Sequence, residues 1–328
     1  MPPMNRTLTA LAGVRVGHAQ DLKRRTGSTV VLLDPPAMAY ASIRGGWPGS
    51  YDTAAAELGR TFLNYHALFL TGGDIYGYDA AIGIRRFLLK RGLAERVGPG
   101  RMPAIMGTNI YDVDFGPIAG RDFPSLGEQA CRAASRRPVP QGTVGAGTGA
   151  TVGPFFEDSS LAGTKGGLGS CSLSAGGWTV GAIVVTNSVG NVHDPFVGRT
   201  IAGTHRKESS NFLEMNDLLN DYLHHRANRF GTTIGVVGTN APLDHEQLAR
   251  LTELAHDGLA LAVHPAHMST DGDALLGFCT GRRPRYRLGF RAFDVLHHLA
   301  VQAVVHSTLN AVRAATTLGG YQGLAGLA

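Results

Sequence analysis

Short apolar segments and longer amphipathic segments alternate along the whole chain, and this alternation restricts the fold more than any other feature. Six apolar segments rich in β-branched residues predict strands at residues 28–33, 67–73, 103–107, 178–187, 232–240 and 274–280. Six others have helical periodicity, at residues 52–65, 78–91, 125–135, 210–229, 244–262 and 292–313. No Pro/Ser-rich linker and no internal repeat interrupts the series. The pattern therefore favours one layered α/β domain.

The composition excludes several classes of protein. With 328 residues, 43% of them hydrophobic and 17% charged, the chain can bury a sizeable core and is globular. No stretch approaches 18 uninterrupted apolar residues, and the N-terminus lacks the basic and apolar regions of a signal peptide. We therefore expect a cytoplasmic protein with no membrane partner.

Charged and metal-binding residues suggest no cofactor and no nucleic-acid partner. The net charge is +5, and the densest basic run, residues 281–291, is not joined to any recognition module, so a solvated loop before a helix is the favoured interpretation. Cys131, Cys171 and Cys279 are odd in number without CxxC spacing, which is typical of small core residues. His264 and His267 lie close in sequence but outside an HExxH motif, so we expect no metal site.

Glycine is the informative excess. The 45 glycines gather in "SIRGGWPGS", "LTGGDIYGYDAAIG", "GTVGAGTGATVG" and "GTKGGLGS", and such turns let a backbone or a substrate approach closely. We therefore expect these segments to form the walls of a cleft. A phosphate loop is excluded because "GAGTGATVG" lacks a following Lys-Ser/Thr, and a dinucleotide site because an acidic loop follows instead of a crossover helix.

The segment "GTTIGVVGTN" places Gly231 directly before two threonines at the start of a predicted strand. A threonine hydroxyl becomes a useful nucleophile when a base takes its proton, and the residue's own α-amine can be that base once the preceding bond is cut. Glycine before the bond leaves its carbonyl open to attack. From these residues alone, a turn glycine followed by an ordinary strand is the favoured interpretation.

Segments along nearly the whole chain resemble the DmpA-type aminopeptidases, a family that includes β-aminopeptidases and NylC-like nylon-oligomer hydrolases. "GTTIGVVGTNAPL" resembles the family's self-cleavage segment. The other similar segments follow in family order: "AGVRVGHAQDLKRRTGSTVVL", "IRGGWPGSYDT", "LTGGDIYGYDAAIGIRRFL", "QGTVGAGTGATVG", "KGGLGS", "VGAIVVTNSVGNV" and "DGDALLGF". The resemblance implies a four-layer αββα sandwich of the DmpA/ornithine acetyltransferase type, similar in its layers to the N-terminal nucleophile hydrolases. It also implies one domain, cut into an α chain of residues 1–231 and a β chain of residues 232–328.

The resemblance also implies the site residues. Cleavage between Gly231 and Thr232 makes Thr232 the nucleophile, with Thr233 as the rival whose side chain points to the opposite face of the strand. Asn187 in "VVTNSVG" matches the asparagine whose amide stabilises the oxyanion, and Tyr111 matches a tyrosine beside the nucleophile.

In "HMSTDGD", Asp271 and Asp273 match the family's pair of polar side chains that orient the nucleophile and its amine, whereas Ser269 is interpreted as a loop-capping residue. NylC carries a lysine where this chain has Pro154, and Lys165 is the candidate to supply that charge instead. This departure from the family pattern predicts slower processing or an altered substrate choice.

We therefore expect a self-processing amide hydrolase that acts as an aminopeptidase on short peptides or amino-acid amides. Three alternatives stay open at this point. The first is a 6-aminohexanoate oligomer hydrolase, because the paired aspartates resemble those of NylC. The second is an acyltransferase of the ornithine acetyltransferase kind, disfavoured because no Ala-Thr-Met run stands at the cut. The third is a non-enzymatic binding module. The expected assembly is a homo-oligomer of α/β heterodimers.

Overall fold

The structure is a computed structural model that describes residues 5–209, 211–224, 230–282 and 287–326. Its main sheet has nine strands in the order β11, β12, β16, β18, β2, β4, β7 and β3, with β1 paired to β2. These strands are β1 Val14–Asp21, β2 Thr26–Ile43, β3 Ser50–Tyr51, β4 Asn64–Thr71, β7 Ile105–Asn109, β11 Gly167–Ala175, β12 Trp178–Asn187, β16 Thr232–Thr239 and β18 Ala274–Cys279. The helices are α1 Ala80–Lys90, α2 Phe123–Ala133, α3 Leu219–His224, α4 His245–Ala262 and α5 Phe290–Arg313.

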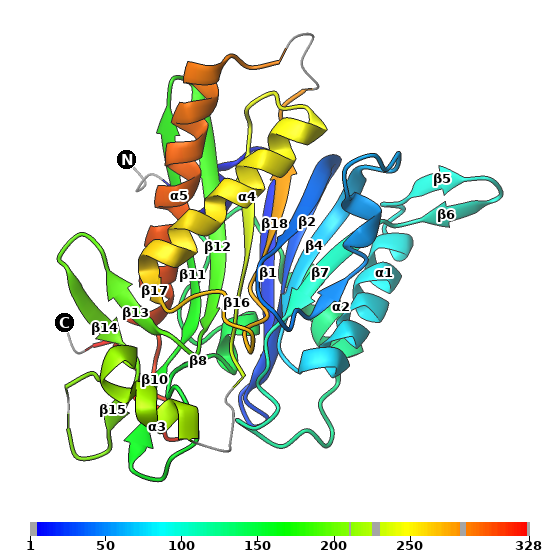
Figure 1. Ribbon diagram of the computed structural model, residues 1–328. Coiled ribbons are helices and arrows are strands. Elements are labelled where there is room, and N and C mark those ends of the chain that lie inside the picture. Colours follow the sequence, from blue (N-terminus) through cyan, green and yellow to red (C-terminus); the bar gives the residue numbers. More distant parts are fainter. Residues whose placement is uncertain (1–4, 210, 225–229, 283–286, 327–328) are drawn as a thin grey trace.

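Short strands form small sheets beside the main one. They are β5 Glu95–Val97, β6 Gly100–Met102, β8 Thr151–Val152, β9 Leu161–Ala162, β10 Thr164–Lys165, β13 Asn191–Asp194, β14 Arg199–Ala202, β15 His205–Arg206 and β17 Val263–His264. The pair β8 and β10 lies close to the site described below, whereas β5 and β6 form a hairpin that projects from the far side of the molecule (Figure 1).

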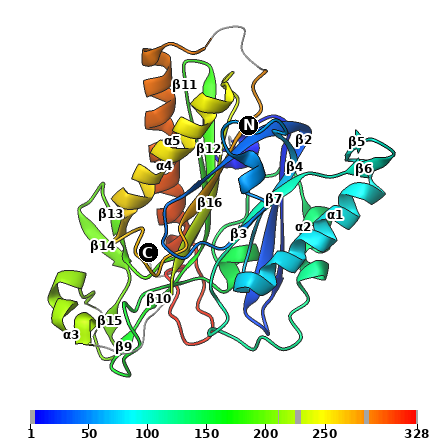
Figure 2. The same ribbon diagram turned by 45° about the vertical axis from the view of Figure 1, so that its right-hand side comes forward.

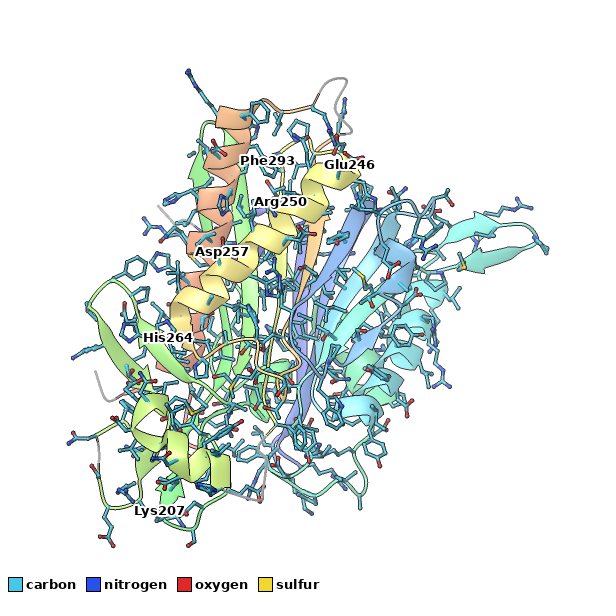
Figure 3. The ribbon with its side chains drawn as sticks, viewed as in Figure 1. Lys207, Glu246, Arg250, Asp257, His264 and Phe293 are labelled. Atoms are coloured by element: carbon cyan, nitrogen blue, oxygen red, sulfur yellow. The ribbon has the colours of Figure 1, made fainter. Side chains whose placement is uncertain are left out.

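The long strand β2 joins two halves of the main sheet. Its first part, residues 26–33, pairs with β1 and β4, and its last part, residues 38–43, pairs with β18. Helices α4 and α5 cover the half that contains β11, β12, β16 and β18, and helices α1 and α2 cover the other half (Figures 1 and 2). The exposed face of α4 carries Glu246, Arg250 and Asp257 (Figure 3).

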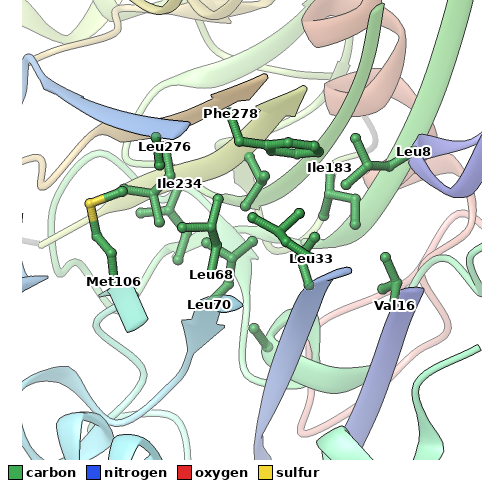
Figure 4. Close-up of a cluster of buried hydrophobic side chains, with 14 of the residues drawn as sticks. Leu8, Val16, Leu33, Leu68, Leu70, Met106, Ile183, Ile234, Leu276 and Phe278 are labelled. Carbon is green, nitrogen blue, oxygen red and sulfur yellow. The ribbon is translucent and has the colours of Figure 1, made fainter. Parts of the chain in front are cut away.

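Alternation along the strands explains the four layers. In β12, Ile183 and Val185 lie in the core between the two halves, whereas Val184 between them packs toward α4 and α5. In β2, Leu33 lies in the same central core and Leu32 packs toward α1 and α2. Figure 4 shows the central cluster, to which both halves contribute. The expected αββα sandwich is confirmed, and strands buried on both faces read as continuous apolar runs.

Two of the predicted helices differ from the structure. The helix predicted at 52–65 is wrong, because this segment contains only a 3₁₀ turn at Ala54–Ala56 before β4 begins at Asn64. Gly59 has φ +84°, a left-handed conformation that ends helical propagation despite the Ala and Glu around it. The helix predicted at 210–229 is short: the described part has a 3₁₀ turn at Met215–Leu218 and α3, and residues 210 and 225–229 lie outside the described residues.

Candidate active site

Thr232 is the first residue of β16 and faces the space between the two halves of the sheet. Ile234 and Val236, two and four residues further on, lie in the central core, so the strand alternation directs Thr232 to the same side. Antiparallel pairing with β12 puts Asn187 directly opposite Thr232. Thr233 faces the other side, where its buried Oγ1 has no hydrogen-bond partner in the part of the chain that the structure describes.

Two groups contact the carbonyl oxygen of the Gly231–Thr232 bond. Thr232 Oγ1 is 2.5 Å from the carbonyl oxygen of Gly231, and the Gly272 N–H donates to that same oxygen at 3.0 Å. A side chain on Gly231 would have no room, because an added Cβ would lie 2.5 Å from Val189 N and 2.8 Å from Asp271 Oδ1. Glycine is therefore required here by close packing rather than by a left-handed φ.

The parallel pairing of β16 with β18 brings the two aspartates to the start of β16. The register that pairs Ile234 with Ala274 continues backward as a bridge between Gly231 and Asp271. Asp273 Oδ1 accepts a hydrogen bond of 2.7 Å from Thr233 N. The "DGD" segment thus continues a strand beside the Gly231–Thr232 bond, with each carboxyl group close to it.

The two aspartates have different surroundings. Asp273 Oδ2 accepts hydrogen bonds from His267 N at 3.0 Å and His267 Nδ1 at 2.8 Å, so this carboxylate is held on both oxygens. Asp271 Oδ2 accepts from Met268 N at 3.0 Å, but the buried Asp271 Oδ1 makes no hydrogen bond of ordinary geometry to any described residue. Burial, and then the charge of Asp273, raise the pKa of Asp271 to about 7. Asp271 can therefore exchange a proton near neutral pH.

Asn187 and Tyr111 belong to the same cluster. Asn187 Oδ1 accepts from Thr151 N at 2.9 Å, which fixes the orientation of the amide, and Asn187 Nδ2 donates to the Tyr111 carbonyl oxygen at 3.1 Å. Because Nδ2 carries two N–H groups, one stays available beyond this bond. Tyr111 borders the cavity next to Thr232.

Lys165 lies below this cluster and holds the glycine-rich loop. Its fully buried ammonium donates to the carbonyl oxygens of Gly147, Ala150 and Gly166, at 3.0, 2.6 and 2.9 Å. Burial lowers the pKa of Lys165 to about 7, although the three carbonyl acceptors and the charge of Asp112 favour the ammonium form. Lys165 also pairs across two short strands with Thr151, the residue that orients Asn187.

A cavity of about 100 Å³ opens beside Thr232. Trp47 and Gly49 come from one predicted glycine-rich wall and Asp74 from another, as expected for walls of a cleft. The remaining lining residues are Asn109, Tyr111, Phe230, Gly231, Thr232 and Thr270. The two other glycine-rich segments do not line the cavity; they surround Lys165 instead.

Several residues singled out in the sequence lie elsewhere or have another role. Ser269 is exposed, and its backbone packs against Gly46. The His264 ring stacks on His193, whereas His267 bonds to Asp273, so the two histidines do not form one site. Over the described residues, no cluster of three or more His, Cys, Asp or Glu is placed to hold a metal, and no helix is long and apolar enough to cross a membrane.

The cysteines and the basic segment at residues 281–291 agree only partly with the predictions from the sequence. Cys131 and Cys279 are buried core residues, as predicted, and Cys171 is half-buried. Of the basic run, residues 283–286 lie outside the described residues, and Arg287 pairs with Asp244 and Glu246.

Three features of the site escaped the sequence analysis. They are the Gly272 N–H, the bond between His267 and Asp273, and the contacts of the Phe230 ring with Trp47 and Tyr111. A glycine between two paired aspartates was the available signal for the first. The sequence gives no comparable signal for the bond between His267 and Asp273. Their separation of six residues matches no recognisable motif, and His267 was predicted only to lie outside a metal site.

Comparison with known proteins identifies relatives along almost the full length. Residues 6–325 match the model of peptidase family S58. An uncharacterized aminopeptidase of Mycobacterium leprae is 32% identical over 310 residues, which cover 85% of this chain and 79% of that protein. A 6-aminohexanoate-oligomer endohydrolase of a Kocuria species is 27% identical over 272 residues, covering 82% and 73%.

Solved structures show the same fold. The L-aminopeptidase D-Ala-esterase/amidase of Ochrobactrum anthropi, described as a variant of the Ntn hydrolase fold, aligns with a TM-score of 0.74 at 22% identity over 97% of this chain and 88% of that one. A β-aminopeptidase of a Burkholderia species aligns with a TM-score of 0.71 at 23% identity, over 99% and 92%.

Proposed function

The chain belongs to peptidase family S58 and hydrolyses peptide or amide bonds, and from this premise we propose that Thr232 is its nucleophile. The protein is made as one chain that cuts its own Gly231–Thr232 bond. The products are an α chain of residues 1–231 and a β chain of residues 232–328. Because β16 of the β chain pairs with β12 of the α chain, the two pieces should stay together after the cut.

The observation that carries this proposal is the contact of Thr232 Oγ1 with the Gly231 carbonyl. In the first step Oγ1 attacks the Gly231 carbonyl carbon and its proton passes to Asp271 Oδ1, a buried oxygen that makes no hydrogen bond of ordinary geometry to the described residues. The negative charge that develops on Gly231 O is stabilised by the Gly272 N–H, already bonded to that atom.

The second step breaks the bond between Gly231 and Thr232. Asp271 returns the proton to the leaving nitrogen, the C–N bond breaks, and an ester remains between Gly231 and Thr232 Oγ1. Water then hydrolyses this ester, which frees the carboxylate of Gly231 and both the amine and the hydroxyl of Thr232. No outside cofactor is needed for this sequence of bonds.

Amide hydrolysis by the cut protein reuses the same groups. The new α-amine of Thr232, with a pKa of about 7.7 to 8.0 for such groups, takes the hydroxyl proton as Oγ1 attacks the substrate carbonyl. The N–H of Gly272 and the remaining N–H of Asn187 are the candidates to bind the oxyanion, and Tyr111 borders the space for the substrate. Asp273, held by His267, fixes the backbone at Thr233 and thereby the strand start.

For the substrate, we propose short peptides or amino-acid amides first, in agreement with the aminopeptidase relatives. Oligomers of 6-aminohexanoate are the second candidate, because the Kocuria relative is an oligomer endohydrolase and because paired aspartates flank the proposed nucleophile. Assembly into a homo-oligomer of α/β heterodimers is part of the same proposal.

Turnover without an acceptor tests the hydrolase against an acyltransferase. Purified protein should release p-nitroaniline from amino-acid anilides in a buffer free of amines, since water takes the acyl group. The released acyl product should be the free acid. A strict requirement for an added amine, with the acyl group recovered on that amine, would contradict the hydrolase and favour the acyltransferase.

A further inference from the structure

Phe230 lines the cavity beside Thr232, and its ring lies between two other aromatic side chains. The ring of Phe230 lies 5.1 Å from the ring of Trp47 in an edge arrangement, and 5.5 Å from the ring of Tyr111 in a tilted one. Both separations fall in the range of favourable aromatic pairs. Phe230 is thus held between two aromatic walls, one residue before the bond that we propose is cut.

The first wall has a fixed position relative to the nucleophile. Trp47 is 67% exposed, yet its backbone N donates to Asp271 O at 2.8 Å, and Gly46 N donates to Met268 O at 3.2 Å. An added Cβ on Gly46 would lie 2.7 Å from Ser269 O, so the loop must pass close to the aspartate segment. The backbone that carries Trp47 is therefore fixed beside the aspartate segment.

The acyl position next to Thr232 is narrow, in contrast to the space between Trp47 and Tyr111 that accepts an aromatic ring. In the proposed self-cleavage, Gly231 is the acyl residue that Thr232 attacks, so its α-carbon marks the acyl position. A side chain added there would overlap Val189 N and Asp271 Oδ1, both closer than 3.0 Å to the added Cβ. Val189 N is a backbone atom, and the Asp271 carboxyl group is buried and held at its other oxygen by Met268 N, so neither atom can easily make room for a Cβ.

We propose that Phe230-Gly231 is a surrogate for the preferred substrate, an inference that rests on the proposed cut before Thr232. The acyl residue has an unsubstituted CH₂ beside its carbonyl, and a flat apolar group one residue further fits the slot between Trp47 and Tyr111. After the cut, the new C-terminus must leave this slot before a substrate enters it. Amides of an aromatic residue followed by glycine are the substrate class that satisfies both positions.

Three dipeptide p-nitroanilides separate the two positions. Phe-Gly-p-nitroanilide should show a kcat/KM about tenfold above that of Ala-Gly-p-nitroanilide, which leaves the slot empty. Phe-Ala-p-nitroanilide should fall at least about tenfold below Phe-Gly-p-nitroanilide because of its Cβ. Equal rates for Phe-Gly and Ala-Gly, or for Phe-Gly and Phe-Ala, would overturn the inference while leaving the proposed hydrolase intact.

Matched variants place the effect at the slot. Trp47→Ala should reduce the Phe-Gly to Ala-Gly ratio to within about twofold, and Trp47→Phe should restore most of it. Phe290→Ala, which removes an aromatic side chain that is exposed at the start of α5, should leave the ratio unchanged. An unchanged ratio in Trp47→Ala would overturn the assignment of the slot.

Binding gives a readout that does not depend on turnover. The chain has two tryptophans, so in a Trp178→Phe background the fluorescence reports Trp47 alone. In cut protein, the dipeptide Phe-Gly should change this fluorescence in a saturable way, and Ala-Gly should not. In the uncut Thr232→Ala protein, Phe-Gly should have no effect because Phe230 fills the slot; a saturable change there would overturn the surrogate.

Discussion

Two buried ionisable side chains, Lys165 and Asp271, lie near the Asn187 end of β12, and they differ in how completely their own hydrogen bonds are made. Around Lys165, each ammonium N–H has a carbonyl partner. Around Thr232, Asp271 Oδ1 is buried without an ordinary hydrogen bond, and the Asp271 pKa is raised to about 7. A buried polar atom without a partner costs free energy that a scaffold alone does not require.

The difference separates chemistry from support. A fully bonded ammonium can hold a loop in place but has no free N–H to give to a reacting group. A buried carboxylate oxygen that makes no hydrogen bond of ordinary geometry to the described residues, beside a bond that we propose is cut, is available to take a proton. We therefore expect changes at Asp271 to slow the reaction and changes at Lys165 to weaken the fold.

The largest effect is expected from Thr232 itself. Thr232→Ala removes the hydroxyl that contacts the Gly231 carbonyl, so the chain should stay whole and show no amide hydrolysis above background. Thr232→Ser keeps the hydroxyl but loses the methyl that restricts χ1, and it should still be cut, more slowly. Denaturing gels over a time course measure both. A Thr232→Ala protein that still separates into two pieces would contradict the proposal that the Thr232 hydroxyl cuts the chain.

Asp271→Asn should have the next largest effect, slowing self-cleavage by about 10² to 10³. In the wild type, the cleavage rate should rise with pH up to about 7 and level off above it, because the deprotonated carboxyl takes the hydroxyl proton. The variant should lose this slope. A pH profile that keeps the same slope in Asp271→Asn would assign the proton transfer to another group.

The free energy of unfolding, compared with and without Asp271→Asn, gives a second test, in which the pH dependence has the opposite sign to that of the cleavage rate. The folded pKa of Asp271 lies above its unfolded value, so folding is favoured when the group is protonated. In the uncut Thr232→Ala background, the free energy of unfolding should therefore fall as pH rises from about 4 to about 7, relative to the same protein with Asp271→Asn. Urea denaturation at several pH values measures this difference. If the difference is absent, the surroundings of Asp271 do not favour its protonated form.

Lys165→Met should lower the free energy of unfolding by roughly 2 to 4 kcal/mol, since three buried carbonyls lose their donor. The folded fraction should still cut itself at a rate within about threefold of wild type. The control is Lys90→Met, which changes an exposed lysine on α1 and should be nearly neutral. A Lys165→Met protein of normal stability that fails to cut itself would move Lys165 into the chemistry.

Thr233→Val should have the smallest effect. The Thr233 hydroxyl is buried without a partner on the face opposite Thr232, so its replacement should change the free energy of unfolding by less than about 1 kcal/mol, in the stabilising direction. Self-cleavage should proceed, since the backbone N–H that bonds Asp273 is kept. A loss of cleavage in this variant would show that the rival threonine takes part.

The sequence predicted the fold best where strands carry large apolar side chains. The strands β12, β16 and β18, and the helices α4 and α5, lie close to their predicted bounds. Two long strands of the main sheet, β1 and β11, were not predicted, because their glycines weaken the strand pattern. An added Cβ on Gly17 of β1 would lie 2.0 Å from Ala130 O of α2, and one on Gly169 of β11 would lie 2.0 Å from Ser307 O of α5. The close helix contact requires glycine, and glycine lowers the strand signal.

The site was predictable in its parts but not in its connections. The strand period predicted that Thr232 and Thr233 face opposite sides, and the fold places Thr232 with Ile234 in the inner row. The difference between Asp271 and Asp273, by contrast, depends on His267, which reaches Asp273 through a loop with φ +60° at the histidine itself. Hydrogen bonds made through such a loop have no sequence period that could reveal them.

The N-terminal sequence of the smaller fragment tests the central claim most directly. Purified wild-type protein should separate on a denaturing gel into pieces of about 24 and about 10 kDa, in proportion to residues 1–231 and 232–328 of a 34.5 kDa chain. Sequencing of the smaller piece should begin Thr-Thr-Ile-Gly, with Thr232 first. A smaller piece that begins at Thr233, or a chain that stays whole while it hydrolyses amides, would contradict the account.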